Sequence, residues 1–246
     1  KAAVLIPKVI HFCWLGRGAY PELIQKCIDS WHRFLPDYEI RLWNEDTFDT
    51  SSVLWVQQAM EQRKFAFAAD YIRFYALYHH GGIYLDTDVE TLKSFDELLH
   101  RREFLCEEAN GDVESGIMGT EKGAQWVREC MEYYETHPFV RSDGSLDMRS
   151  VPLLIDDVML DHRDIEILPM DYFSPKDFNT GRTHVTANTF CIHHYSCSWI
   201  NKGMMFKVKI MAHRLLYVLF GHKGHNAIVR KIRQRRGQLK YWRTGY

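Results

Sequence analysis

Residues 65–90 constrain the fold more than any other stretch of the 246-residue chain. They read FAFAADYIRFYALYHHGGIYLDTDVE. The first part has the length and apolar content of a buried helix, which Gly81 and Gly82 should end. The β-branched and aromatic run after the glycines predicts a strand over residues 83–90. A helix that feeds directly into a strand is typical of an α/β protein with a mostly parallel sheet.

The sequence before and after this block continues the alternation. Residues 8–16 predict a buried first strand, residues 20–36 a helix, and residues 38–44 an alternating strand. Two further helices are expected over residues 122–137 and 150–162. With 46% hydrophobic residues, the chain can bury a large core as one domain. In such a sheet, ligands bind beyond the carboxyl ends of the strands.

Asp86 and Asp88 lie near one of these strand ends, one residue apart. In an extended strand alternate side chains share a face, so the two carboxylates are expected to point the same way. Like charges at this spacing repel unless water or a cation lies between them, and Mg²⁺ and Mn²⁺ prefer carboxylate oxygen. The alternative, common for a short D-x-D motif, is the solvated face of an edge strand.

The helix before this motif carries a second polar pair. Asp70 and Arg73 are three residues apart and should therefore be neighbours on one helical face. A surface ion pair is the simpler interpretation and contributes little stability. The rest of the helix is nearly all apolar or aromatic, however, and the planar guanidinium of arginine suits phosphate or sugar hydroxyls. A functional use of the pair is therefore a working hypothesis.

The segment CIHHYSCSW, residues 191–199, contains two adjacent histidines. Imidazole is a common ligand for Mn²⁺-class ions, so His193 or His194 could complete the site begun by the aspartates. Only one of them should point inward, because successive residues of a strand face opposite ways. Two alternatives are a Zn²⁺ site with Cys191 and Cys197, whose spacing matches no common zinc motif, and histidines that fill a strand end.

The C-terminal part of the chain is strongly basic. Twelve of the 31 lysines and arginines lie between Lys202 and Tyr246, a segment without any of the 32 aspartates and glutamates. Its apolar residues form one helical stripe, namely Val208, Met211, Ala212, Leu215 and Leu219. Such a tail favours an anionic membrane, a nucleic acid or the acidic body of the protein as its electrostatic partner. The alternative is a closing helix whose stripe packs on the body.

Three separated blocks, in order, resemble a known glycosyltransferase family. The blocks are IPKVIHFCWLG, the segment 65–90 and HHYSCSW. The family contains the yeast Golgi initiating α-1,6-mannosyltransferase and bacterial capsular polysaccharide sugar transferases, and the central block is also similar to clostridial glucosylating toxins. The resemblance implies a GT-A type domain over residues 1–201, with a nucleotide-sugar-binding half (1–104) and an acceptor half that closes the metal site (105–201). Residues 202–246 would form a basic amphipathic helical tail.

The resemblance also implies a role for each matching residue. Asp86 would contact the ribose and help to hold the metal ion, and Asp88 would be a direct metal ligand. His194 matches the metal position of the third block, and Trp199 its closing tryptophan near the β-phosphate. The remaining implied donor contacts are Asp70 and Arg73, at the transferred sugar and the phosphates, and Trp14, stacked on the base.

The implied activity is a metal-dependent glycosyl transfer that forms an α-linkage with retention. The donor would be a nucleotide sugar, with UDP favoured over GDP, bound with Mn²⁺ or Mg²⁺. The acceptor would be a glycan or a lipid-linked glycan, as in surface polysaccharide biosynthesis. Front-face attack and double displacement are both open, because no clear nucleophile is present. The rival functions are a metal-dependent phosphohydrolase, a basic-tailed nucleic-acid-binding protein and a noncatalytic sugar-binding module.

Six scattered cysteines without C-x-x-C spacing favour free thiols in a reducing compartment. The chain has no run of eighteen apolar residues, and residues 1–16 lack the pattern of a signal peptide. At about 1 kcal/mol per basic residue near an anionic leaflet, the tail could hold the protein at a membrane. The expected location is therefore cytoplasmic and peripheral on the inner face of the membrane, with no nucleic-acid partner.

Overall fold

The computed structural model describes residues 5–108, 111–177, 180–196 and 204–235. Its elements follow in chain order: β1 (Val9–Cys13), α1 (Glu22–Phe34), β2 (Glu39–Trp43), α2 (Leu54–Glu61), α3 (Phe65–His80), β3 (Gly82–Leu85), β4 (Val89–Thr91), the 3-10 helix η1 (Asp96–Leu98), β5 (Glu103–Cys106), β6 (Ile117–Thr120), α4 (Gln125–Thr136), α5 (Val151–Val158), β7 (Ile167–Leu168), β8 (Cys191–His193) and α6 (Met204–Arg235).

The main sheet has six strands in the order β2-β1-β3-β6-β5-β7. Strand β6 pairs antiparallel with both of its neighbours, and the other pairs in the sheet are parallel. Five of the six strands therefore run in one direction, which confirms the predicted α/β class with a mostly parallel sheet. Strand β5 connects β6 to β7 within the sheet, since Phe104 pairs with β6 and the next residue, Leu105, pairs with β7. Strands β4 and β8 form a separate two-stranded sheet.

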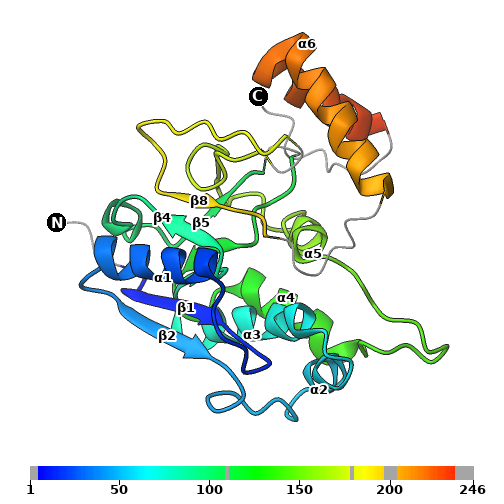
Figure 1. Cartoon of the computed structure of the whole chain (residues 1–246). Coiled ribbons are helices and arrows are strands. Elements are labelled where there is room, and N and C mark those ends of the chain that lie inside the picture. The colour runs from blue at the N-terminus through cyan, green and yellow to red at the C-terminus, as the bar shows by residue number, and fades with distance from the viewer. Residues whose placement is uncertain (1–4, 109–110, 178–179, 197–203, 236–246) are drawn as a thin grey trace.

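Helices cover both faces of the main sheet (Figure 1). Helix α1 packs its buried residues with Ile10 and Phe12 of β1 and with Ile83 and Leu85 of β3. Helices α2, α3, α4 and α5 share a second core with side chains that point the other way, such as Tyr84. Alternate strand residues thus enter opposite cores, which explains why β1 and β3 are apolar almost throughout.

The prediction of one strand over residues 83–90 is wrong. Strand β3 ends at Leu85, and residues 86–88 form a turn in which the Val89 amide donates to the Asp86 carbonyl at 3.0 Å. The chain then enters β4, which belongs to the other sheet. Asp86 and Asp88 therefore flank a turn and do not share the face of a strand.

The glycine pair ends α3 as predicted. Gly81 and Gly82 have φ angles of 65° and 106°, a region that disfavours side chains. A Cβ atom on Gly82 would lie 2.7 Å from the Val9 carbonyl oxygen. The two glycines let α3 pass into β3 without a loop, and this connection fixes the helix beside the strand that leads to the aspartates.

His11 of β1 is a buried histidine at this same junction. Its Nε2 lies 2.8 Å from the Gly81 carbonyl oxygen, and the Trp43 indole N–H donates to its Nδ1 at 3.1 Å. Both bonds suit the neutral ring with its proton on Nε2. Burial lowers the pKa of His11 from 6.5 to about 4, against the raising effect of the bond to Gly81.

We expect His11 to make folding pH-dependent. Because its folded pKa is lowered, its contribution to stability is present above pH 6.5 and is lost as pH falls to about 4. The loss amounts to roughly 3 kcal/mol. A His11→Gln variant should be less stable at pH 7 but should lose less stability between these pH values. Urea unfolding at several pH values measures this. The same change of unfolding free energy with pH in both proteins would contradict the prediction.

Helix α6 lies beyond β8 and α5, on the far side from β2 (Figure 1). It has a non-helical residue, Gly221 with φ 66°, where the chain kinks. Tyr217, His225 and Val229 of α6 are buried. The Tyr217 hydroxyl lies 2.6 Å from His184 Nε2. Among the described residues, no helix combines the length and hydropathy needed to cross a bilayer.

Candidate active site

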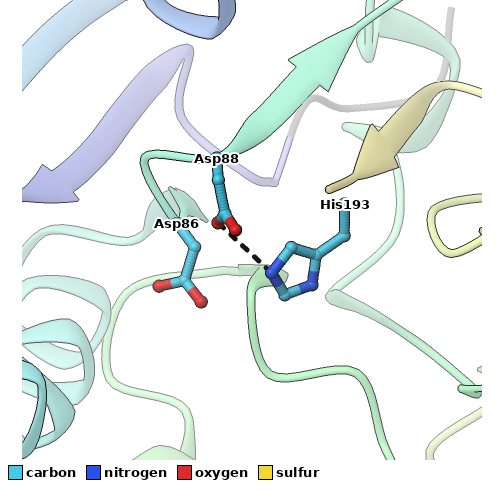
Figure 2. A group of neighbouring side chains, drawn as sticks. All are labelled: Asp86, Asp88 and His193. Atoms are coloured by element: carbon cyan, nitrogen blue, oxygen red, sulfur yellow. Dashed lines mark ion pairs between the residues drawn. The ribbon is translucent and has the colours of Figure 1, made fainter. Parts of the chain in front are cut away.

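Asp86, Asp88 and His193 converge at the junction of the two sheets. Each offers one ligand atom, and these atoms all lie within 4.8 Å of one another. Figure 2 shows the carboxylates, from either end of the turn after β3, facing the imidazole at the end of β8. The register of the small sheet pairs Val89 with His193, which carries the ring to the turn. The predicted proximity of the two aspartates is present.

The histidine beside the aspartates is His193, whereas the sequence analysis favoured His194. His194 points away, with its Nε2 2.8 Å from a carboxylate oxygen of Glu90. The two rings face opposite ways because successive residues of β8 alternate. Cys191 does not join either histidine, since it is buried with its thiol directed to the Phe173 carbonyl. Cys197 lies outside the described residues, and the described ones do not form the alternative zinc site.

Asp88 is a buried carboxylate whose neighbours stabilise its negative charge. Its Oδ2 accepts the Ser196 amide N–H at 2.7 Å, and its Oδ1 lies 3.3 Å from His193 Nε2. Burial alone would raise the pKa of Asp88, but His193 and the Ser196 N–H outweigh burial and hold the pKa below the usual range. The carboxylate is therefore ionised at neutral pH.

Asp86 is more exposed than Asp88. The Tyr84 hydroxyl donates to its Oδ1 at 3.0 Å, and Arg73 Nη1 lies 3.4 Å from the same atom. Burial raises the pKa of Asp86, an effect that Arg73 and His193 oppose. The Arg73 contact joins the polar pair of α3 to the aspartates of the turn.

Asp70 and Arg73 form the predicted i,i+3 pair, with 2.8 Å between carboxylate and guanidinium. They are not a surface pair, since they are 7% and 6% exposed. Arg73 also donates to the Ser115 carbonyl at 2.9 Å, but its buried Nε has no hydrogen-bond partner within the described structure. Burial raises the pKa of Asp70 to about 7, against the lowering effect of Arg73.

Gly116 leaves room at the centre of this cluster. A Cβ atom there would lie 2.8 Å from His193 Cε1 and 3.0 Å from both Asp86 Oδ2 and Glu114 Oε1. Glu114 is fully buried and its Oε1 lies 3.0 Å from His193 Nδ1. Glu114 was not predicted from the sequence, because it lies in the polar segment 107–116 among three other acidic residues and no local signal distinguishes it from them.

Trp14 follows β1 at the carboxyl edge of the sheet, and β1 is paired with β3. Its indole N–H donates to the Gly18 carbonyl at 2.6 Å, and its ring meets Tyr20 edge-on at 4.9 Å. The ring is partly exposed and partly packed against the α1 core. Trp199 lies outside the described residues.

Residues 21–105 match the family described as "Glycosyltransferase sugar-binding region containing DXD motif". The match covers 85 of the 246 residues, about a third of the chain. It holds four of the residues described above: Asp70, Arg73, Asp86 and Asp88. The DXD motif of the family is the Asp86-Thr87-Asp88 turn between the two sheets.

Curated relatives of the chain share this DXD region. Inositol phosphoceramide mannosyltransferase 3 of Schizosaccharomyces pombe is 30% identical over 133 residues, which are 51% of this chain and 36% of the relative. A mannosyl phosphorylinositol ceramide synthase of Saccharomyces cerevisiae is 32% identical over 123 residues, 47% of this chain and 32% of the relative. The matches thus span about a third of these relatives. A solved structure, PaToxG Glycosyltransferase, is 17% identical with a TM-score of 0.48, over 64% of this chain and 69% of that one.

Proposed function

We propose that the protein is a metal-dependent, retaining glycosyltransferase of the GT-A type. It moves a sugar from a nucleotide sugar, with UDP favoured over GDP, to a glycan or lipid-linked glycan. The observation that carries the proposal is the convergence of Asp86, Asp88 and His193 within 4.8 Å, at the end of a parallel strand and inside a DXD glycosyltransferase region.

The chemistry of the cluster fits Mn²⁺ or Mg²⁺. Two carboxylates and one imidazole suit these ions, and Gly116 keeps side-chain atoms out of the space between them. Asp86, Asp88 and His193 would hold the ion. When bound, the ion supplies positive charge that stabilises a diphosphate leaving group. A phosphohydrolase could use a similar cluster but would leave the buried Arg73 pair unexplained.

The residues of α3 would bind the donor beside this site. The Arg73 guanidinium lies 3.4 Å from Asp86 at the edge of the cluster, so it would supply positive charge toward the phosphates. Asp70 holds the guanidinium in place and would accept a sugar hydroxyl. Trp14 would stack on the base, since its ring stands partly exposed at the same edge of the sheet. Trp199 would close the site near the phosphates, as the family resemblance implies.

The acceptor is proposed from the relatives. Their names describe mannosyl transfer to inositol phosphoceramide. Transfer to a lipid-borne acceptor is therefore the version of the proposal that they support, with mannose as the first sugar to test. The further proposal of a role in surface glycan biosynthesis, capsular polysaccharide included, rests on the family resemblance of the sequence alone.

The test is a screen of UDP-sugars and GDP-sugars for sugar release or transfer, with Mn²⁺, with Mg²⁺ and with excess chelator. We expect turnover of one nucleotide sugar, dependent on the ion, and an α-linked product. Phosphate release from a simple phosphoester is the control reaction. Hydrolysis of the phosphoester in place of any nucleotide sugar would favour the phosphohydrolase and overturn the proposal.

The exposed side of α6 supports peripheral membrane attachment. Met211, Leu215 and Leu219, predicted to lie on one stripe, are 68%, 61% and 63% exposed. These three residues of the stripe do not pack on the body, whereas Tyr217, His225 and Val229 are the buried residues among the described side chains of α6. Exposed apolar residues on a basic helix suit the headgroup layer of an anionic membrane. We therefore propose attachment to the inner, cytoplasmic face of the membrane, where a lipid-linked acceptor would be within reach.

Cosedimentation with vesicles tests this attachment. A Leu215→Glu/Leu219→Glu variant should lose most of its binding to vesicles of phosphatidylcholine and phosphatidylglycerol. The substitutions place negative charge on the side of α6 that would enter the membrane surface. The matched control is Leu54→Glu/Leu153→Glu, which changes two exposed leucines on α2 and α5. Equal binding by all three proteins, or no binding by the unmodified protein at low salt, would count against a membrane role for α6.

A further inference from the structure

Glu114 is a fully buried carboxylate that receives hydrogen bonds on both oxygens. Its Oε1 accepts the Gly116 amide N–H at 2.7 Å and lies 3.0 Å from His193 Nδ1. Its Oε2 accepts the hydroxyls of Ser174 and, at 3.0 Å, Tyr195. The carboxylate is thus fixed in one orientation by groups from three separate parts of the chain.

The bond to His193 decides which ring nitrogen is available to a ligand. A carboxylate only accepts hydrogen bonds, so when His193 is neutral, as a ring that binds an ion must be, its proton lies on Nδ1. The lone pair then lies on Nε2, the atom 3.3 Å from Asp88 Oδ1. Nδ1 is directed away from the aspartates, toward Glu114. Only this tautomer presents a lone pair to the space between Asp86 and Asp88.

We propose that Glu114 is a positioning residue for the candidate metal site. It orients the His193 ring and fixes the tautomer in which Nε2 is free to bind the ion, and it does not touch the ion itself. Carboxylates that hold ligating histidines in this way raise metal affinity and the basicity of the ligand. This inference depends on the metal-dependent function proposed above.

The surroundings of Glu114 separate this role from general packing. Its two oxygens have different partners, since Oε1 meets His193 and Gly116 whereas Oε2 meets Ser174 and Tyr195. A change at Tyr195 removes a bond to Oε2 and leaves the contact with His193 in place. The two effects of Glu114, on the fold and on the ring, can therefore be measured separately.

The experiment compares the unmodified protein with Glu114→Ala, Glu114→Gln and Tyr195→Phe. Mn²⁺ binding is measured from the paramagnetic resonance signal of the free ion, and the His193 tautomer from the ¹⁵N shifts of labelled histidine with Mg²⁺ present. Glu114→Ala should weaken Mn²⁺ binding about ten- to a hundredfold and mix the two tautomers. Glu114→Gln, whose amide oxygen can still accept from Nδ1, should keep the tautomer and weaken binding less. Tyr195→Phe should change neither by more than about twofold.

Thermal unfolding shows whether each variant is folded, and Glu114→Gln decides the question if the alanine variant is not. The inference is overturned if the Glu114 variants bind Mn²⁺ as the unmodified protein does, or if Tyr195→Phe weakens binding as much as they do. In either case the proposed metal site stands. Absence of Mn²⁺ binding by the unmodified protein is a different result, which overturns the metal site and this inference together.

Discussion

Replacing Asp88 with asparagine should lower the rate of sugar transfer by about a thousandfold while the protein stays folded. The charge of this carboxylate is what an ion requires, and a bound ion supplies several kcal/mol of stabilisation to a leaving diphosphate. Asparagine keeps the shape and can still accept the Ser196 N–H at the position where Asp88 accepts it now. Turnover of the nucleotide sugar at saturating donor, with Mn²⁺ in excess, measures the effect.

Two matched controls make this prediction sharper. Glu90 lies two residues beyond Asp88 but pairs with Lys26 and His194 outside the cluster, so Glu90→Gln should retain most of the activity. In the same way, His193→Ala should lower the rate of sugar transfer as much as the loss of an aspartate does, whereas His194→Ala should lower it only slightly. Near-normal transfer by Asp88→Asn, or full activity in excess chelator, would show that the cluster does not act through a metal ion.

Replacing Arg73 with methionine should cost about 3 to 5 kcal/mol of folding free energy and abolish transfer. The side chains of Arg73 and Asp70 are only 7% and 10% exposed, so the variant leaves a buried carboxylate without its partner. The guanidinium also supports Asp86, 3.4 Å away, and lies 4.7 Å from the centre of the Tyr84 ring. Urea unfolding gives the stability, and a nucleotide-sugar assay gives the activity.

An exposed ion pair provides the comparison for Arg73. Lys93 and Glu97 are 3.4 Å apart with 36% and 67% of their side chains exposed, and Glu97→Gln, which leaves the other contacts of Lys93 in place, should cost less than about 0.5 kcal/mol. The double variant Asp70→Asn/Arg73→Met should recover much of the stability, because no buried charge is left unpaired, but none of the activity. Recovery of sugar transfer in the double variant would show that Asp70 and Arg73 serve only the stability of the fold.

Local patterns predicted the elements that begin and end with clear signals. Helix α3 was read from its length and from the Gly81–Gly82 pair, and α1 from its apolar spacing. Strands β5, β6 and β7 were not predicted, because they are short and, unlike the equally short β3, do not follow a helix that ends at a glycine pair. The antiparallel direction of β6 depends on which strands it lies between, and no short stretch of sequence encodes that information.

The candidate site shows the same division between local and distant information. Helical periodicity was enough to bring Asp70 and Arg73 together. The spacing of Asp86 and Asp88 gave their proximity but the wrong cause, because a turn breaks the expected strand. The choice between His193 and His194 depends on the register of β8 against β4. Glu114 enters through a connection between strands, so its role appears only when the chain is folded.

The pairing of β4 with β8 has a consequence for the newly made chain. In this pairing Val89 lies opposite His193, which is 104 residues later in the chain. Closing so long a loop is costly in entropy, and such contacts form late in folding. On the ribosome, both aspartates emerge well before the histidine that faces them. The three groups of the candidate site can therefore meet only after residue 193 has been synthesised, so formation of this site depends on completion of the fold.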